Sequence, residues 1–377
     1  MNNEELNDIR KQIDFLDEQL VDILYKRSNL ISKVAISKQK TGKSIYAPDR
    51  ELELLRNLKN KAKNKGVSTD LVDNLMRRII NNSYESQSRS KLAGIGPLDK
   101  DIVIIGGGGQ LGKLFVRLFV NSGYTVKIIE KDDWQNAENI VSNASLALVS
   151  VPINMVDDAL DMIPLLPKEC VLADLTSVKE KPIKKMKEIH KGPVIGFHPM
   201  FGPDVKSLVK QVIIYCPVRY MSKCNWVLTQ FQIWGASAFE MKPSEHDRIM
   251  GYIQAVRHFT TFVLGFNLMR ENINLEEVIK VCSPIYRLEL IMVGRLFAQN
   301  PELYADIIFS SKKNLELLRN IGDRFNEALI WVEHGDKKRF IRSFKDIYNW
   351  FGKYSEEFLK ESSDFLEEVY IQKQKEL

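Results

Sequence analysis

The chain has 377 residues, a net charge of +5, 44% hydrophobic and 27% charged residues, a balance that excludes a disordered chain and predicts two or three globular domains. No apolar run is long enough to span a membrane and the N-terminus has no apolar signal segment, so we expect a cytoplasmic protein with no membrane partner. The four cysteines lack C-x-x-C spacing, so neither a metal site nor a disulfide framework is expected.

The positive charge is concentrated near the N-terminus. Residues 1–95 contain 18 Lys and Arg against 13 Asp and Glu, which accounts for the whole net charge. A basic helical segment fits a nucleic acid, a small polyanionic substrate or a solvated face. The segment lacks a recognisable helix-turn-helix, and its cations share a face with apolar residues, so we expect no nucleic-acid partner.

The first ninety residues predict three helices. Apolar residues at helical spacing run from Leu6 to Val34, and no proline or glycine interrupts them before Gly42, which indicates one long helix. A second helix is predicted from about residue 48 to 63 and a third from about 70 to 87. Three helices without a large core usually need a second chain, so we expect a dimer.

Three cations on the first helix have informative positions. Arg27 and Lys38 are eleven residues apart, which places them within about 20° of one another on the apolar face. A charge on that face needs a counter-ion or solvent, because burying it alone is costly. Arg10 is turned about 100° away from Arg27, and in a dimer it would be free to face another chain. Taken alone, these residues are more typical of cations that snorkel from a helical seam.

The helical segment resembles the all-helical chorismate mutase family, which carries three cations on helix 1, Arg-Glu opening helix 2 and Ser-x-x-x-Gln ending helix 3. The matching residues are Arg10, Arg27, Lys38, Arg50, Glu51, Ser83 and Gln87. The resemblance implies an intertwined homodimer that converts chorismate to prephenate. Arginines would hold the carboxylates, Lys38 and Gln87 would donate to the ether oxygen, and Glu51 would accept from the ring hydroxyl. Ala47 stands where some members carry an acid that helps to hold this hydroxyl.

Residues 86–100, rich in Ser, Gly, Pro and Lys, read as a linker, and the buried strand Asp101–Ile105 follows. A G-x-G-x-x-G turn then leads into a helix, with Gly107, Gly109, Gln110, Leu111 and Gly112 as the candidate cofactor-binding residues. These glycines allow backbone amides to approach a pyrophosphate. A second strand, Tyr124–Ile129, ends at Glu130, eighteen residues after Gly112. An acid there accepts from the ribose hydroxyls and repels a 2′-phosphate, which predicts NAD.

Further buried strands are predicted at 146–151, 171–175 and 194–197. Ser177 follows one of them, and His198 follows another in a turn rich in proline and glycine. Ligands of open α/β sheets lie beyond the carboxyl ends of the strands, and imidazole titrates near neutrality, so His198 is a candidate general base. The other four histidines are more simply surface or core residues.

This region resembles prephenate dehydrogenases. The resemblance rests on the glycine turn, on Asp-Leu-Thr-Ser-Val-Lys at 174–179 and on Gly-Phe-His-Pro-Met-Phe-Gly-Pro at 196–203. It implies NAD-dependent oxidative decarboxylation of prephenate to 4-hydroxyphenylpyruvate. His198 would take the proton of the ring hydroxyl, and Ser177 would orient His198 or the substrate. The family also leads us to expect tyrosine as a feedback inhibitor.

The C-terminal part is predicted to be mainly helical, and segments 250–268 and 284–298 are apolar almost all round, as at a dimer core. Arg295 has no acid three or four residues away, so its counter-ion must come from elsewhere. A distant carboxylate would satisfy it. The family resemblance instead assigns Arg295 to a prephenate carboxylate, and Arg287 either lines the same cleft or supports the interface.

The whole pattern predicts a multidomain protein. We expect an all-α domain at 1–92, an α/β Rossmann-like domain at 99–203 and a mainly helical substrate-binding and dimerisation domain at 204–377. The expected function is that of a bifunctional enzyme of tyrosine biosynthesis. The alternatives are an NAD-dependent dehydrogenase of another small acid, whose helical arm serves only dimerisation, and a non-enzymatic nucleotide-sensing protein.

Overall fold

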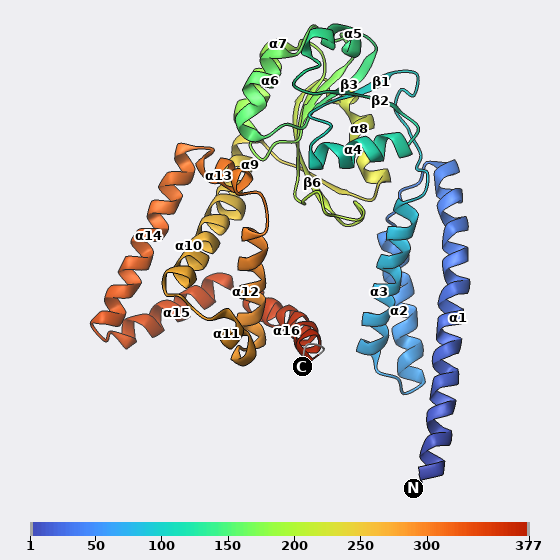
Figure 1. Cartoon of the computed structure of the whole chain (residues 1–377), viewed down its shortest axis with the longest axis vertical. Coiled ribbons are helices and arrows are strands. Elements are labelled where there is room, and N and C mark those ends of the chain that lie inside the picture. The colour runs from blue at the N-terminus through green and yellow to red at the C-terminus, as the bar shows by residue number, and fades with distance from the viewer. Residues whose placement is uncertain (1–2, 375–377) are drawn as a thin grey trace. The chain divides into compact units, whose positions relative to one another are not determined.

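The computed structural model describes residues 3–374. The chain divides into two compact units, and the boundary between them in the sequence lies between Glu245 and His246. The first unit contains three N-terminal helices and a seven-stranded sheet. The described part of the second unit, residues 246–374, consists of helices (Figure 1). Two of the three predicted fold types, helical and α/β, are thus combined in the first unit.

The N-terminal helices confirm the sequence prediction. They are α1 (Asn3–Thr41), α2 (Pro48–Asn64) and α3 (Thr69–Ser88). Proline in the first turn favours the start of α2, and Ser68 caps α3 by accepting a hydrogen bond from the amide of Leu71 at 3.3 Å. Along α1 only Ala35 is buried, so most of the apolar stripe of this long helix is exposed.

The central sheet has the strand order β2-β1-β3-β4-β5-β6-β7. Its strands are β1 (Asp101–Ile105), β2 (Thr125–Ile129), β3 (Ala144–Val149), β4 (Val171–Asp174), β5 (Val194–Pro199), β6 (Val212–Arg219) and β7 (Ser237–Glu240). Strands β1 to β5 are parallel, β6 runs antiparallel to β5, and β7 is parallel to β6. The chain reverses its direction of travel between β1 and β3, and such switch points are where open α/β sheets bind ligands.

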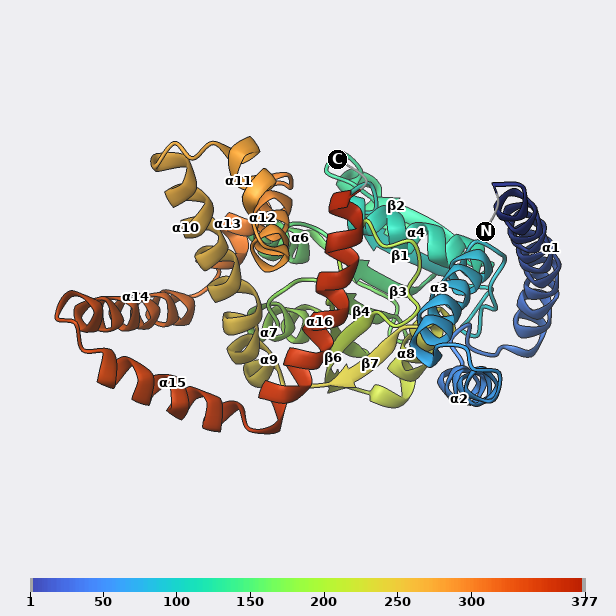
Figure 2. The same cartoon turned by 90° about the horizontal axis from the view of Figure 1, so that it is seen from below.

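Helices cover both faces of the sheet (Figure 2). One face packs against α4 (Gln110–Asn121) and α8 (Met221–Ile233), and the other against α5 (Ala137–Val141), α6 (Val156–Met162) and α7 (Glu180–Ile189). Single 3-10 turns at Trp134–Asn136 and Ile153–Met155 precede α5 and α6. Alternate strand residues supply the two cores: Ile104 faces the first and Ile105 the second.

The N-terminal helices pack on the α/β part of the same unit. Leu55, Ile80 and Tyr84 belong to the same hydrophobic core as α4 and α8. The loop after α1 is also joined to the end of α8, where the amide of Ile45 donates to the carbonyl of Ile233 at 3.0 Å. These contacts hold the helical segment against the nucleotide-binding fold.

The second unit is built from helices that follow α9 (Pro243–Met250), which crosses the boundary between the units. A π-helical segment, Gly251–Val256, leads into α10 (Arg257–Arg270), and the chain continues through α11 (Leu275–Val281), α12 (Pro284–Phe297), α13 (Pro301–Phe309), α14 (Lys312–Glu333), α15 (Lys337–Phe351) and α16 (Lys353–Gln374).

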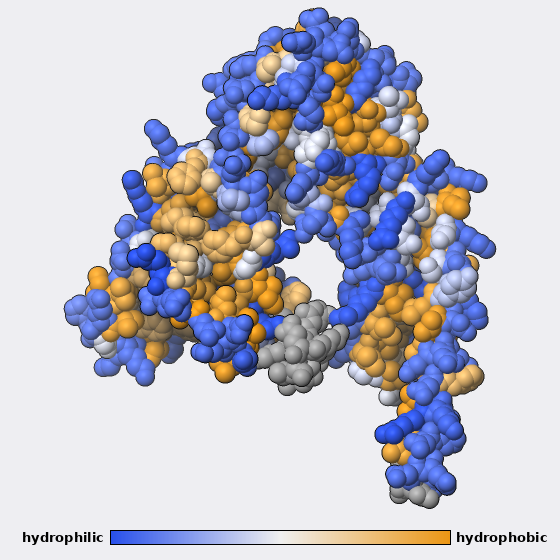
Figure 3. Space-filling view, viewed as in Figure 1, coloured by the Kyte–Doolittle hydropathy of each residue, from blue (hydrophilic) through white to orange (hydrophobic). Residues whose placement is uncertain are grey.

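The apolar helices α10 and α12 are incompletely buried within one chain. Phe262, Phe266 and Ile291 are each more than 40% exposed, and Figure 3 shows apolar side chains on the surface of the helical regions. Among residues 3–374, no helix is both long and apolar enough to cross a membrane.

Candidate active sites

Two half-buried cations of α1 face neutral oxygens. Arg27 Nη1 donates to Ser83 Oγ at 2.5 Å, and Lys38 Nζ donates to the carbonyl of Ile45 at 2.5 Å. Burial lowers the pKa of both cations. Within residues 3–374, neither cation has a carboxylate within ion-pair distance. Their charges are therefore unmatched by the protein, an arrangement that favours an anionic ligand.

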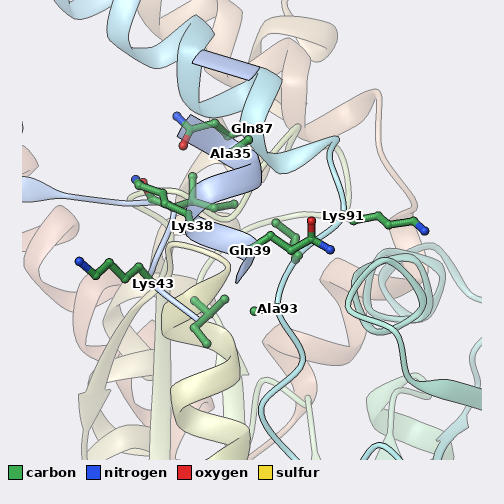
Figure 4. Close-up of a pocket in the computed structure, with 10 residues that line it drawn as sticks. Ala35, Lys38, Gln39, Lys43, Gln87, Lys91 and Ala93 are labelled. Carbon is green, nitrogen blue, oxygen red and sulfur yellow. The ribbon is translucent and has the colours of Figure 1, made fainter. Parts of the chain in front are cut away.

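Gln87 lies beside these cations on α3. Its side-chain Nε2 donates to the carbonyl of Ser83 at 3.2 Å, while its buried Oε1 has no hydrogen-bond partner in the part of the chain that the structure describes. Lys38 and Gln87 line one small cavity (Figure 4). The same cavity is also lined by residues that the motif did not identify, among them Gln39, Lys43, Lys91 and Ile233. Ile233 belongs to α8, so the α/β part contributes to the wall.

The side chain of Glu51 is buried, and each of its two carboxylate oxygens has a partner. Lys210 Nζ lies 2.6 Å from its Oε1, and the Tyr84 hydroxyl donates to its Oε2 at 3.2 Å. Burial, together with the charge of Glu51, raises the pKa of Tyr84 to about 12, so this phenol stays a donor. Arg50, by contrast, is exposed and pairs with Glu53 at 2.7 Å. Arg10 is exposed near the start of α1. The structure brings together four residues of the sequence motif, Arg27, Lys38, Ser83 and Gln87. It leaves Arg50 and Arg10 apart from them.

The glycine turn links β1 to α4, at the switch point of the sheet. Gly106 has a φ of +81°, and a Cβ there would lie 2.6 Å from the carbonyl oxygen of Ser150. A Cβ at Gly112 would collide with the carbonyl of Gly106, so helix and turn approach closely. Gly107 is buried and Gly109 is the N-cap of α4, while Gln110 opens the helix and Leu111 follows. The turn fits a dinucleotide pyrophosphate, and Gly106 is the residue that the motif did not single out.

Glu130 lies at the end of β2, as predicted, and contacts the turn directly. The amide of Gly108 donates to its Oε1 at 2.5 Å, and a Cβ at Gly108 would lie 2.9 Å from the same oxygen. The carboxylate is exposed. Lys127 pairs instead with Asp101 at 2.8 Å, at the opposite end of the strands. Glu130 thus holds the glycine turn through its Oε1.

The loop after β4 carries Ser177 and is fixed by a fully buried ion pair. Lys179 pairs with Asp174, and its Nζ also donates to the carbonyl of Phe197 in β5 at 2.7 Å. Thr176 donates to the same carboxylate through its hydroxyl and its amide. Ser177 is half-buried at the tip of this loop. The pair therefore ties the loop of Ser177 to the strand of His198, a role that sequence reasoning did not assign to Lys179.

His198 is placed in the strand, not in the turn after it. Antiparallel pairing with β6 extends β5 to Pro199, with His198 opposite Ile214. The predicted turn position was therefore wrong, because a partner strand from later in the chain supplies the hydrogen bonds. His198 is buried at the carboxyl end of β5, the same edge of the sheet as the glycine turn and Ser177.

Arg287 and Arg295 lie two turns apart on α12 in the second unit. Arg287 is half-buried, and Arg295 is exposed in the last turn. A Cβ at Gly294 would meet nothing within 4 Å, so open space adjoins Arg295.

Comparison with known proteins gives the family. A T-protein of Enterobacter agglomerans is 45% identical over 362 residues, which covers 96% of this chain and 97% of that protein. A T-protein of Haemophilus influenzae is 44% identical over 372 residues, covering 98% and 99% of the two chains. The chain belongs to the T-protein family.

The family models agree with this assignment. Residues 9–88 match chorismate mutase type II, residues 123–236 the nucleotide-binding domain of prephenate dehydrogenase and residues 242–346 its dimerization domain. This T-protein family member is therefore a bifunctional enzyme of tyrosine biosynthesis. The alternative of a non-catalytic helical arm is set aside, because that arm matches a mutase family.

The fold is also similar to that of solved dehydrogenases. A prephenate dehydrogenase from A. aeolicus, in complex with hydroxyphenyl propionate and NAD+, has a TM-score of 0.54 at 17% identity and covers 66% of this chain and 96% of that one. The match shows a shared fold over two thirds of this chain.

Proposed function

We propose that Arg27, Lys38, Ser83, Gln87 and Glu51 form the chorismate mutase site. The pericyclic rearrangement needs no nucleophile or general base. It needs a compact substrate conformer and donors for the negative charge that develops on the ether oxygen. The observation that carries this proposal is the pair of half-buried cations without a carboxylate partner among residues 3–374. Loss of chorismate absorbance in the absence of NAD tests the activity.

Each side chain has a specific role in this proposal. Arg27, steadied by Ser83, binds one carboxylate of chorismate, and Lys38 donates to the ether oxygen. Gln87 also donates to the ether oxygen when its side-chain amide flips, so that Nε2 takes the position of Oε1, which has no hydrogen-bond partner among the described residues. Glu51 accepts from the ring hydroxyl. Arg50 reaches the substrate only by releasing Glu53.

The mutase site is completed by a second copy of the chain. Leu16, Leu20 and Ile23 on α1 are each more than 50% exposed, an apolar stripe that a partner helix would bury. Arg10 is exposed in the same N-terminal part of α1, on a different face from this stripe, and would reach the partner's site. The match of residues 242–346 to a dimerization domain supports a homodimer.

The α/β domain carries the dehydrogenase chemistry. Its glycine turn and Glu130 would hold NAD, and bound NAD would supply the hydride acceptor for the oxidation. His198 hydrogen-bonds the ring hydroxyl of prephenate and takes its proton, and Ser177 orients His198 or the substrate. Loss of CO₂ makes the ring aromatic. Arg295 binds a carboxylate of prephenate, and Arg287 supports that contact.

Two expectations rest on the family and the composition. Tyrosine, the end product of the pathway, acts as feedback inhibitor. The four free cysteines, three of them buried, fit the reducing cytoplasm.

Glu130 should make the enzyme prefer NAD over NADP. Its carboxylate beside the glycine turn would repel a 2′-phosphate, so kcat/KM should favour NAD on the order of tenfold or more. Glu130→Gln should reduce this ratio, whereas Glu138→Gln, an exposed acid on α5, should leave it unchanged. Equal kcat/KM values for the two cofactors in the unmodified enzyme would contradict the assignment.

Arg295→Gln should raise the KM for prephenate strongly and change kcat less. The proposed carboxylate contact exists in both the ground state and the transition state, so its loss removes uniform binding. Lysine should not restore binding fully, because it lacks the planar fork of the guanidinium. Arg319→Gln, on the exposed face of α14, is the control. An unchanged KM in folded Arg295→Gln would make Arg295 a structural residue.

A further inference from the structure

Lys210 projects from the α/β domain to the buried Glu51 of the mutase helices. It lies in the connection between β5 and β6, 159 residues away in the sequence, and its Nζ is 2.6 Å from Glu51 Oε1. The Glu51 side chain is only 6% exposed, against 36% for Lys210. A buried carboxylate needs such a cation, because removing one partner of a buried pair is strongly destabilising.

The backbone of Lys210 is held in an unusual conformation. Its φ is 64°, in the left-handed region that residues with a Cβ seldom adopt, and its amide donates to the carbonyl of Gly235 at 3.1 Å. Such backbone conformations persist only where contacts with the surrounding structure hold them in place. Here the conformation presents the lysine to the mutase helices.

The contacts around Lys210 are specific to the mutase segment. Its Nζ lies 5.8 Å from the ring centre of Tyr46 and 5.9 Å from that of Tyr84, and it also donates to Asn81 Oδ1 at 3.4 Å. Tyr84 in turn donates to the second oxygen of Glu51. Both oxygens of this carboxylate are therefore fixed, one of them by a residue of the other catalytic domain.

We infer that Lys210 is a positioning residue for the mutase reaction. It holds the Glu51 carboxylate in the orientation that accepts the ring hydroxyl of chorismate, although it belongs to the dehydrogenase part of the chain. This inference rests on the proposed role of Glu51. A second link points the same way, because Ile233 of α8 holds the amide of Ile45, whose carbonyl accepts from Lys38.

The test compares variants of the full-length enzyme. Lys210→Met keeps the length of the side chain but removes its charge, and it should lower mutase kcat/KM about tenfold, mainly through a higher KM for chorismate, since the hydroxyl contact is present before reaction. Lys210→Arg should restore kcat/KM to within about threefold of the unmodified enzyme. Lys206→Ala is the matched control, because Lys206 forms an exposed ion pair with Glu85 of α3 at 3.7 Å and should leave the mutase unchanged.

A double variant identifies the route of the effect. Glu51→Gln should itself raise the KM for chorismate, and Lys210→Met added to it should cause little further loss, because coupled residues are not additive. If Glu51→Gln has no effect, the proposed role of Glu51 fails and the inference fails with it. If Glu51→Gln acts but Lys210→Met matches Lys206→Ala, or if the two losses simply multiply, only the inference is overturned. Dehydrogenase turnover of supplied prephenate reports that each variant folds, and Lys210→Gln replaces Lys210→Met if the latter does not.

Discussion

Replacing His198 with asparagine should lower the kcat of prephenate oxidation by roughly 10²–10⁴-fold, the usual contribution of a positioned general base. The contact between imidazole and the ring hydroxyl strengthens as the hydride leaves, so its loss affects the transition state more than substrate binding. The KM for prephenate should therefore change less than kcat. The acidic limb of the pH–rate profile should also flatten, because protonated imidazole no longer limits the reaction.

The control for this variant is His334→Asn. His334 is exposed at the end of α14 and is expected to leave both activities unchanged. Mutase activity of His198→Asn, measured by loss of chorismate, should be retained, since His198 lies in the sheet and not among the mutase helices. A folded His198→Asn enzyme with unchanged kcat would show that another group takes the proton.

Lys38→Ala should lower the mutase activity by about 10²-fold or more, while dehydrogenase activity with supplied prephenate changes little. Removing one preorganised donor from a site of developing charge has an effect of this size. Burial lowers the pKa of Lys38, so the amine loses its proton at a lower pH than an ordinary lysine. The kcat/KM of the mutase should consequently decline on the alkaline side earlier than an exposed lysine would allow.

Lys40→Ala serves as the comparison, because Lys40 is exposed and lies in the same last turn of α1. It should alter neither activity. A parallel loss of both activities in folded Lys38→Ala enzyme would mean that the two reactions do not use separate residues.

Local periodicity was enough to predict several elements of this chain. The three N-terminal helices, β1, the glycine turn and Glu130 are where the sequence pattern places them, because each depends on neighbours within one helical turn or one strand. The sequence also predicted which types of residue the candidate sites contain. The spacing alone places Arg27 and Lys38 on one face of α1. In the structure, Arg27 donates to Ser83 of α3, and Lys38 lines one cavity together with Gln87 of α3.

Tertiary structure decided the contacts between distant segments. His198 lies in a strand because β6 pairs with it, and β6 and β7 extend the sheet beyond residue 203. Lys179 is a buried partner of Asp174, and the sequence alone does not distinguish it from a surface lysine. The exposed position of Arg50 likewise depends on the orientation of α2.

The pairing of Glu51 with Lys210 shows the difference most clearly. The sequence identifies Glu51 as an acid at the start of a helix, in a segment that resembles a mutase. It contains no signal that Lys210, 159 residues later, approaches this carboxylate, since an ion pair of this kind depends on how two folded segments pack together. Composition and periodicity determine which elements form and which chemical groups they carry, because both are properties of neighbouring residues. The electrostatic environment of those groups depends on burial and on distant partners, and these exist only after the chain has folded.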